Sequence, residues 1–318
     1  MDAVISSIHD RNGIRVLELR AADGSPLPQY QAGAHLDVSL GNGLVRQYSL
    51  CCKQPSGASY RIAVKREPQS RGGSEWLHSQ ARVGDTLRIG APRNAFALAP
   101  DAPIHLLFAG GIGITPILSM AYELLRRGQP FRLAYFVRDE GNIAFAGEMA
   151  AMPLAAHTDI HAGLSPQENA AHIAVLLAEA PAGAQVYVCG PGPFMDAVVT
   201  QASTLLGAAA VHKESFGAPA GGISGAGADE APFVLRLARS GRDIAVPAGR
   251  SALACLQDAG IDIDCSCEVG VCGTCRTTVL DGVPDHQDTV LSEQERQAND
   301  CFLPCVSRAR TAVLQIDL

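Results

Sequence analysis

Four cysteines near the end of the chain constrain its structure more than any other feature. Cys267, Cys272 and Cys275 form a C-x4-C-x2-C pattern, and Cys305 follows after a gap of 29 residues. This spacing is typical of plant-type [2Fe–2S] proteins, in which four thiolates hold two bridged irons. The glycines between these cysteines are expected to take positive φ angles and to turn backbone N–H groups toward the sulfurs.

Two other interpretations of the cysteines fit less well. Structural zinc sites usually show two C-x2-C pairs, and only one such pair is present here. Disulfide frameworks are typical of short secreted chains, whereas this chain has 318 residues. Cys265 and Cys301 lie near the pattern but are not assigned as ligands, because counting from Cys265 gives C-x6-C. The predicted ligands are therefore Cys267, Cys272, Cys275 and Cys305.

Length, charge and the N-terminal segment narrow the class of protein. The chain is long enough for two or three domains, and its net charge of −7 argues against a nucleic-acid partner. It starts without a basic segment followed by an apolar run, so we expect a cytoplasmic protein with reduced thiols. Residues 104–122 approach the length of a membrane span. Glycines and Pro116 in their middle favour a strand, a turn and a helix, so no membrane segment is expected.

Residues 1–101 are expected to form an antiparallel β-barrel, because evenly spaced short strands separated by turn residues are typical of that fold. The expected strands are residues 4–8, 14–20, 35–40, 45–50, 60–65 and 86–89, with one helix at 74–81.

Two motifs in this barrel combine groups that bind anions and ring systems. Arg46 and Tyr48 share one face of a strand because side chains alternate, so a cation and an aromatic ring lie side by side. Gly72, Gly73 and Ser74 open a helix, where free N–H groups and the positive helix end favour an anion. Each motif alone has a simpler interpretation, a solvated strand face for the first and a turn with an N-cap for the second.

Residues 102–216 are expected to form an α/β domain with a parallel sheet, because strands alternate with helices. Ligands of such sheets bind beyond the carboxyl ends of the strands. The expected strands are residues 104–109, 131–137, 159–162 and 185–189, and the expected helices are 116–127, 143–151, 170–180 and 193–206.

A glycine-rich turn after the first of these strands is the main candidate for a nucleotide site. Residues 111–116 match G-x-G-x-x-G except that proline replaces the last glycine. Glycines let the backbone approach a pyrophosphate, and the following helix offers its N-terminus. The alternative is a turn that needs glycine for steric reasons alone. Asp139 is the candidate for the ribose. The predicted nucleotide-binding residues are Gly110, Gly111, Gly113, Thr115, Pro116, Asp139, Cys189, Gly190 and Pro191.

A Gly- and Ala-rich linker at 217–230 precedes the last domain, residues 231–318. Ser292 and Glu295 form a capping box that predicts the start of a short helix. We expect a small α+β, plant-type ferredoxin domain with strands at 233–238, 243–246, 277–280 and 312–317 and a helix at 251–259.

The order of these motifs resembles the phthalate dioxygenase reductase family, which also includes the reductases of vanillate demethylase, over essentially the full length. The segments that carry the resemblance are 46–51 (RQYSLC), 63–67 (AVKRE), 71–74 (RGGS), 92–96 (PRNAF), 110–116 (GGIGITP), 189–191 (CGP), 214–217 (ESFG) and 305–308 (CVSR), together with the four cysteines.

The resemblance implies three cofactors, FMN, NADH and a [2Fe–2S] cluster, and gives roles to individual residues. Arg46 and Ser74 would bind the flavin phosphate, Tyr48 would pack on the ring, and Ser49 would lie at the flavin edge near N5. The implied FMN residues are Arg46, Tyr48, Ser49, Ala63, Val64, Lys65, Gly72, Gly73, Ser74, Thr115 and Phe216. The implied catalytic residues are Ser49, Cys189, Glu214 and Phe216.

By the same resemblance, the chain is a monomeric, NADH-dependent reductase that delivers electrons to a Rieske-type oxygenase acting on an aromatic substrate. Hydride transfer to the flavin would be followed by single-electron transfer to the cluster. Two alternatives remain open. One is an FAD-dependent NAD(P)H reductase with the same domain order that serves another acceptor. The other is a non-enzymatic iron–sulfur carrier or sensor.

Overall fold

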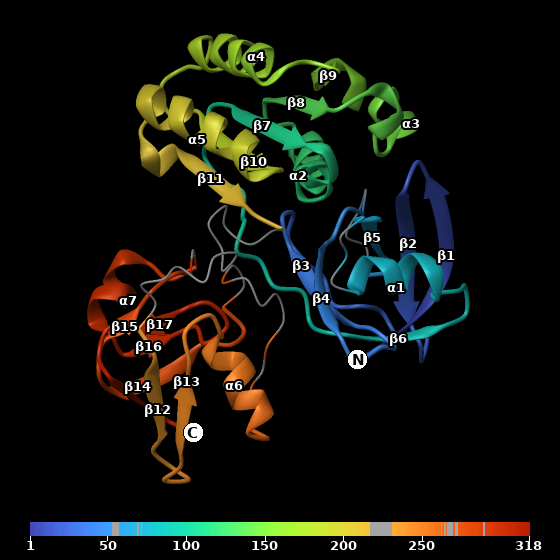
Figure 1. The fold of residues 1–318 in the computed structure, drawn as a ribbon. Coiled ribbons are helices and arrows are strands. Elements are labelled where there is room, and N and C mark those ends of the chain that lie inside the picture. The colour runs from blue at the N-terminus through green and yellow to red at the C-terminus, as the bar shows by residue number, and fades with distance from the viewer. Residues whose placement is uncertain are drawn as a thin grey trace. The chain divides into compact units, whose positions relative to one another are not determined.

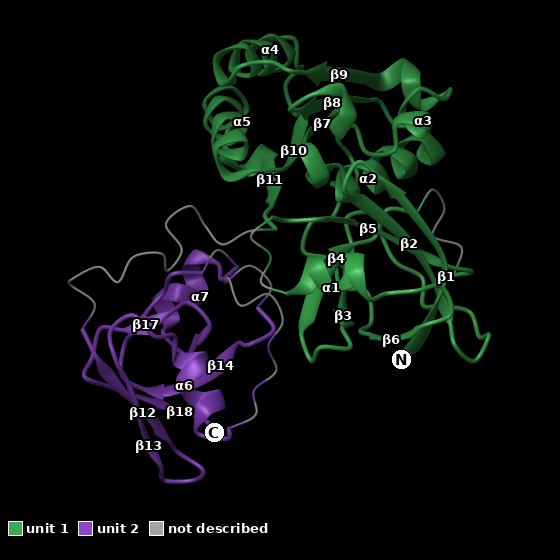
Figure 2. Cartoon of the chain, turned by 45° about the vertical axis from the view of Figure 1, so that its right-hand side comes forward, with its two compact units in different colours: residues 1–216 green, residues 217–318 purple. Residues whose placement is uncertain are grey.

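The structure is a computed structural model that describes residues 1–52, 57–68, 70, 72–216, 231–261, 263, 265, 270, 273–288 and 290–318. The chain divides into two compact units, Met1–Phe216 and Gly217–Leu318 (Figures 1 and 2). The division falls where the linker is expected to begin, and linker residues 217–230 lie outside the described residues. In the described part of the chain, no helix is long and apolar enough to cross a membrane.

The first lobe of unit 1 is a curled antiparallel sheet. Its elements are β1 (Asp2–Arg11), β2 (Ile14–Ala21), β3 (His35–Ser39), β4 (Val45–Ser49), β5 (Tyr60–Lys65), α1 (Gly73–Ser79) and β6 (Thr86–Ile89). The strand order is β4-β3-β6-β1-β2-β5, which places β4 and β5 at opposite edges. The Cys51 N–H donates to the Arg61 carbonyl at 2.9 Å, so the chain leaving β4 meets β5. The edges therefore come together, as expected for a barrel.

The second lobe of unit 1 is a five-stranded parallel sheet with helices on both faces (Figure 1). Its strands are β7 (His105–Gly110), β8 (Phe131–Val137), β9 (Thr158–Ala162), β10 (Gln185–Cys189) and β11 (Val211–Glu214). Its helices are α2 (Ile114–Arg127), α3 (Ala146–Met149), α4 (Pro166–Ala178) and α5 (Gly192–Leu206), with short 3₁₀ turns at Gly111–Gly113, Glu140–Asn142, Leu154–His157 and Ala208–Ala210. The order β11-β10-β7-β8-β9 reverses direction between β7 and β10. Ligands of doubly wound sheets bind at such a reversal.

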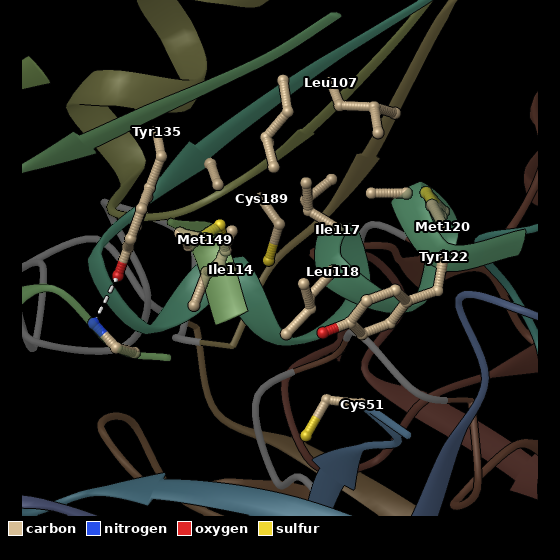
Figure 3. Close-up of a cluster of buried hydrophobic side chains, with 14 of the residues drawn as sticks. Cys51, Leu107, Ile114, Ile117, Leu118, Met120, Tyr122, Tyr135, Met149 and Cys189 are labelled. Atoms are coloured by element: carbon tan, nitrogen blue, oxygen red, sulfur yellow. Dashed lines mark hydrogen bonds between the residues drawn. The ribbon is translucent and has the colours of Figure 1, made fainter. Parts of the chain in front are cut away.

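Two hydrophobic clusters cover the two faces of this sheet. Alternate strand residues face opposite sides, so Leu106 and Phe108 pack with α4 and α5 while Leu107 packs with α2. The α2 cluster also takes in barrel residues such as Cys51. Figure 3 shows Ile114, Ile117 and Leu118 of α2 between the sheet and Cys51. The two lobes of unit 1 therefore share this cluster, while the barrel also has a cluster of its own.

Several expected boundaries in this lobe were wrong. The helix expected at 143–151 is confined to Ala146–Met149, because Phe145 has a φ of +57° and the Ala144 N–H donates to the Tyr135 hydroxyl at 3.2 Å (Figure 3). The helix expected at 170–180 begins at Pro166, where Ser165 and Glu168 form a capping box. Helix α2 begins at Ile114, two residues before the expected start.

A polar contact also joins the two lobes. The Arg61 guanidinium of β5 donates to both oxygens of Glu148 in α3, at 2.8 and 3.1 Å, and to the Cys51 carbonyl at 3.0 Å. The Tyr122 hydroxyl of α2 donates to the same carboxylate. The Phe145 ring lies under the guanidinium, 4.9 Å from its carbon. Only 16% of the Arg61 side chain is exposed, so its charge depends on Glu148.

Replacing Glu148 with Gln should therefore destabilise unit 1 by about 1–3 kcal/mol, because a largely buried cation and a hydroxyl lose a charged acceptor. Thermal unfolding followed by flavin fluorescence would measure the midpoint. Glu75→Gln is the matched control, since its Arg66 partner is exposed and such pairs contribute little. Equal midpoints for the two variants would contradict the role of this contact.

Unit 2 is a small α+β domain, as expected. Its elements are β12 (Phe233–Leu237), β13 (Asp243–Val246), α6 (Ala252–Asp258), β14 (Thr277–Asp281), β15 (Pro284–Asp285), α7 (Glu293–Ala298), β16 (Cys301–Phe302), β17 (Arg308–Ala309) and β18 (Val313–Ile316). The main sheet has the order β13-β12-β18-β14-β16. Arg308 is buried and donates to the carbonyls of Arg250, Ala231 and Pro247 at 2.9–3.2 Å, so it joins three segments of the domain.

Candidate functional site

The two glycine-containing strand ends predicted from the sequence meet at the reversal between β7 and β10. A Cβ on Gly113 would lie 2.3 Å from the Cys189 carbonyl oxygen, and a Cβ on Gly190 would lie 2.9 Å from the Gly110 Cα. A Cβ on Gly110 would lie 2.9 Å from Pro191. Real Cβ contacts are not this short, so these three glycines allow the two strand ends to pack together. Their presence therefore has a steric explanation, the alternative raised by the sequence.

Gly111 is different from the other glycines of this turn. Its φ is +53°, and nothing lies within 4 Å of a Cβ built on it. The Thr115 side chain is buried, and its hydroxyl donates to the Ile112 carbonyl at 3.1 Å. Pro116 lies in the first turn of α2, where its missing N–H costs no helical bond. Gly111 is therefore the residue of this turn with open space beside its backbone.

Three of the four predicted catalytic residues lie together. Ser49 is the last residue of β4 and is buried, and its hydroxyl donates to Glu214 Oε2 at 3.1 Å. Glu214 ends β11 and pairs with Cys189, the last residue of β10. The fourth residue, Phe216, follows β11 and is 43% exposed. The barrel and the parallel sheet therefore both contribute to one polar cluster at the carboxyl ends of the strands.

The electrostatics of Cys189 favour a neutral thiol. The side chain is fully buried, and burial, together with the nearby Glu214 carboxylate, raises the pKa of the thiol well above its usual value. A buried thiol of this kind is a poor nucleophile, because the thiolate is the reactive form. Cys189 therefore contributes a small apolar surface beside Glu214.

A raised pKa lowers the thiolate fraction at any given pH, so alkylation of Cys189 by iodoacetamide should be negligible at pH 8 in the folded protein. Peptide mapping by mass spectrometry would measure the modified fraction. The same protein unfolded in guanidinium chloride is the control and should be fully modified at this position. Rapid labelling of Cys189 in the native state would contradict the buried, neutral thiol.

The predicted phosphate-binding residues of the barrel lie next to one another. Gly73, the first residue of α1, is packed so closely that a Cβ on it would lie 2.7 Å from Arg46 Cγ. The Arg46 guanidinium donates to the Val45 carbonyl at 2.8 Å. Ser74 Oγ donates to Ser70 Oγ at 3.0 Å, and Ser70 Oγ accepts the Gly72 N–H at 3.1 Å. Arg46 therefore contacts the start of α1. Ser70 is a second serine at this place, beside Ser74.

The other predicted cofactor residues lie in the barrel and in the parallel-sheet lobe. Tyr48 packs against the barrel core, and burial raises its pKa. In β5, Ala63 and Val64 are buried, while Lys65 pairs with Glu67 at 3.0 Å. Asp139 follows β8, and its carboxylate accepts from the Asn142 amide at 2.6 Å.

Two of the four predicted cluster ligands are described, and they lie side by side. Cys275 and Cys305 are buried, and their sulfurs are 3.3 Å apart, far beyond the roughly 2.05 Å of a disulfide bond. Cys267 and Cys272 lie outside the described residues, and no group of three candidate metal ligands occurs in the described part. Two facing thiols that form no disulfide with each other, in a buried position, suit two ligands of one metal centre.

The surroundings of these thiols agree with the predicted cluster loop. Gly270 and Gly273 have φ angles of +73° and +72°, as expected. A Cβ on Gly270 would lie 2.6 Å from a Val306 methyl carbon, so Gly270 packs closely on the segment that carries Cys305. Cys301 instead lies in β16, paired with Thr278 of β14. Cys301 is therefore part of the sheet, and its exclusion from the ligands remains a prediction.

Sequence reasoning missed two polar residues at these sites, His35 and Ser70. His35 lies opposite Ser49 in the β3–β4 pairing and 3.5 Å from Glu214. Its place in an alternating strand resembles that of a core residue, so no local signal marks it. Ser70, by contrast, precedes the glycine pair and could have been considered as a cap.

Comparisons with known proteins were made with the whole chain. Residues 235–310 match the 2Fe-2S iron-sulfur cluster binding domain family, and residues 90–210 match the dimethylamine monooxygenase subunit DmmA-like, N-terminal domain family. A vanillate O-demethylase oxidoreductase from Pseudomonas sp. is 44% identical over 303 residues, covering 95% of this chain and 94% of its own. A phthalate dioxygenase reductase from Burkholderia cepacia is 39% identical, covering 95% and 92%.

A solved structure covers nearly the same range. The structure described as phthalate dioxygenase reductase, a modular structure for electron transfer from pyridine nucleotides to [2Fe-2S], matches with a TM-score of 0.77 and 37% identity. The match covers 100% of this chain and 98% of that chain. The similarity therefore extends over both units and not over the metal-binding domain alone.

Proposed function

Because the chain belongs to the phthalate dioxygenase reductase family, we propose that it is the reductase component of a two-component Rieske-type aromatic oxygenase or demethylase. It is an oxidoreductase that takes electrons from NADH through FMN to a [2Fe–2S] cluster and on to the oxygenase. The observation that carries the proposal is the Ser49–Glu214–Cys189 cluster at the strand reversal. It lies in a chain whose other unit holds the facing thiols of Cys275 and Cys305.

When bound, FMN accepts a hydride and releases electrons singly, and the cluster accepts one electron at a time. The residues of this chain supply position, charge and a dry environment. We assign Arg46 and Ser74 to the flavin phosphate, where a cation and a hydroxyl suit an anion. By the same assignment, Tyr48 would pack on the ring and Ser49 would lie at its reacting edge.

The nucleotide is assigned to the turn after β7. The open space beside Gly111 allows a pyrophosphate to approach the backbone, and the N-terminus of α2 favours its charge. Asp139 is assigned to a ribose hydroxyl, since a carboxylate accepts hydrogen bonds there. Cys189 and Glu214 are assigned to the nicotinamide side of the site, with Phe216 next to the flavin. The remaining assigned residues line the two cofactors: Ala63, Val64, Lys65, Gly72, Gly73, Gly110, Gly113, Thr115, Pro116, Gly190 and Pro191.

Hydride delivery needs no general acid or base, but it needs water kept away from the reacting atoms. Ser49 is 4% exposed and Cys189 is fully buried, which supports a site of this kind. Neither side chain has to change its protonation state. Their contribution is to hold the two ring systems in register, because orientation of two reactants is a large part of such rate enhancements.

Anaerobic rapid mixing of the purified holoprotein with NADH tests the proposal. We expect bleaching of the flavin absorbance, followed by bleaching of the cluster absorbance, and release of FMN on acid treatment. A flavin that is not reduced by NADH would exclude the proposal and favour the carrier or sensor alternative. FAD in place of FMN would favour the other reductase class. A parallel titration with NADPH measures the expected preference for NADH.

The assignment of a Rieske-type oxygenase as the electron acceptor rests on reduction potentials as well as on the family. A plant-type cluster has a potential of about −400 mV, below the roughly −150 to +300 mV of Rieske centres, so electrons flow toward the oxygenase. We further propose that the protein works as a monomer in the cytoplasm. Light scattering on the eluting protein would test the first statement, and a stable dimer would overturn it.

A further inference from the structure

His35 contacts the predicted catalytic cluster from the barrel side. It begins β3 and lies directly opposite Ser49 across the β3–β4 pairing. Its Nδ1 is 3.5 Å from Glu214 Oε1, while Ser49 Oγ donates to the other oxygen, Oε2, at 3.1 Å. One carboxylate from the parallel sheet therefore meets two side chains of the barrel, one on each oxygen.

The contact between His35, Glu214 and Ser49 is shielded from solvent. The side chains of His35 and Glu214 are 10% and 14% exposed, and Ser49 is also buried. A buried carboxylate needs a hydrogen-bond partner for its charge, and a missing partner is costly. His35 is fixed in turn, because its N–H and C=O both bond to Arg93 at 2.9 Å. The imidazole is thus held on a rigid strand end.

The chemistry of the two side chains fixes the tautomer of the ring. An ionised carboxylate only accepts hydrogen bonds, so the nitrogen that faces Glu214 must be the donor. A neutral ring must therefore be the Nδ1–H tautomer to donate to this carboxylate. The other nitrogen, Nε2, is buried without a hydrogen-bond partner within the described residues. Nδ1 is therefore the nitrogen through which His35 acts on the cluster.

We propose that His35 is the positioning residue of the hydride-transfer site, a role that rests on the proposed function. Its Nδ1–H holds Oε1 of Glu214 so that Oε2 stays available to Ser49, and this fixes the hydroxyl at the flavin edge. The 3.5 Å separation is long for a hydrogen bond, and such contacts commonly shorten when the substrate complex forms. Without His35, Oε1 loses a contact that orients the carboxylate, so the acceptor of the Ser49 hydroxyl is held less firmly.

Three substitutions at this position separate the two ring nitrogens. The amide of His35→Asn lies near the position of Nδ1, that of His35→Gln lies near Nε2, and His35→Leu has no polar atom. We expect hydride transfer at saturating NADH to fall about 10- to 100-fold in the Leu and Gln variants and to remain close to wild type in the Asn variant. NAD⁺ affinity and FMN content should be unchanged in all three.

Rescue by Gln and not by Asn would overturn the proposal, as would wild-type rates in the Leu variant. If the Leu variant does not fold, the contrast between Asn and Gln still decides. Loss of NAD⁺ affinity together with rate would also count against positioning, since a residue that only orients the reacting groups changes the rate and not the binding.

A second measurement does not depend on activity. Nitrogen-15 NMR of the histidine-labelled holoprotein should show the Nδ1–H form for His35, and Glu214→Gln should change that signal. A ring protonated at Nε2 alone would overturn the proposal. If wild-type protein shows the expected tautomer but NADH does not reduce the flavin, the proposed function fails while the contact stands. The two failures are therefore distinguishable.

Discussion

Cys305→Ser is expected to abolish electron delivery to a one-electron acceptor such as cytochrome c while NADH-driven ferricyanide reduction continues. Cys305 is buried and lies 3.3 Å from the Cys275 sulfur. A serine there cannot supply the thiolate that holds iron. Iron content should fall from about two per chain to none, and the cluster absorbance should disappear. Flavin reduction by NADH should be retained, because it belongs to a separate compact unit.

Cys301→Ser is the matched control for this prediction. Cys301 is as deeply buried as Cys305, but it lies in β16 and is not part of the predicted ligand set. It should keep its iron and its cytochrome c reduction, even if unit 2 becomes less stable. A Cys301 variant that loses iron, or a Cys305 variant that keeps it, would show that the ligand assignment is wrong. Loss of ferricyanide reduction in the Cys305 variant would contradict separable units.

Features written in short sequence motifs could be predicted. The glycine turn after β7 depends on residues a few positions apart, so its geometry is local. The positive φ angles of Gly270 and Gly273 were expected for the same reason. The capping box of Ser165 and Glu168 is also visible in the sequence. The start of α4 at Pro166, and not at residue 170, could therefore have been predicted.

Contacts between distant parts of the chain could not be predicted. Ser49 and Glu214 are 165 residues apart, and each was assigned by resemblance without any indication that they touch. From the sequence, His35 looks like an ordinary strand residue. Only its contact with Glu214 of β11 marks it as part of the site. Strand β11 was not expected, because its sequence Val-His-Lys-Glu is polar. It exists because it pairs with β10, and this pairing is what brings Glu214 to the site.

The glycines of the turn after β7 show that one sequence motif can contain glycines required for different physical reasons. The sequence offered two explanations for the turn after β7, approach of a pyrophosphate or a steric requirement. In the structure, Gly113 has the steric reason and Gly111 has open space. A single motif therefore contains both kinds of glycine, and substitutions can separate them.

Gly113→Ala is accordingly expected to lower kcat/KM for NADH about 100-fold while FMN content is retained. The φ of Gly113 is −59°, so alanine suits the backbone, and the defect is purely steric. The new Cβ would lie 2.3 Å from the Cys189 carbonyl oxygen, which forces the end of β10 to move. Glu214 is paired with Cys189 and would move with it, and a misplacement of about 1 Å can cost about 10²-fold in rate.

Gly147→Ala is the control, because Gly147 lies within α3 with nothing within 4 Å of a new Cβ. It should leave kcat/KM unchanged. Steady-state kinetics with ferricyanide measure both variants without involving the cluster. Wild-type kcat/KM in Gly113→Ala would contradict this prediction, because it would show that the end of β10 can move without reducing activity. A loss confined to KM would instead place Gly113 in nucleotide binding alone, since removal of uniform binding raises KM and leaves kcat intact.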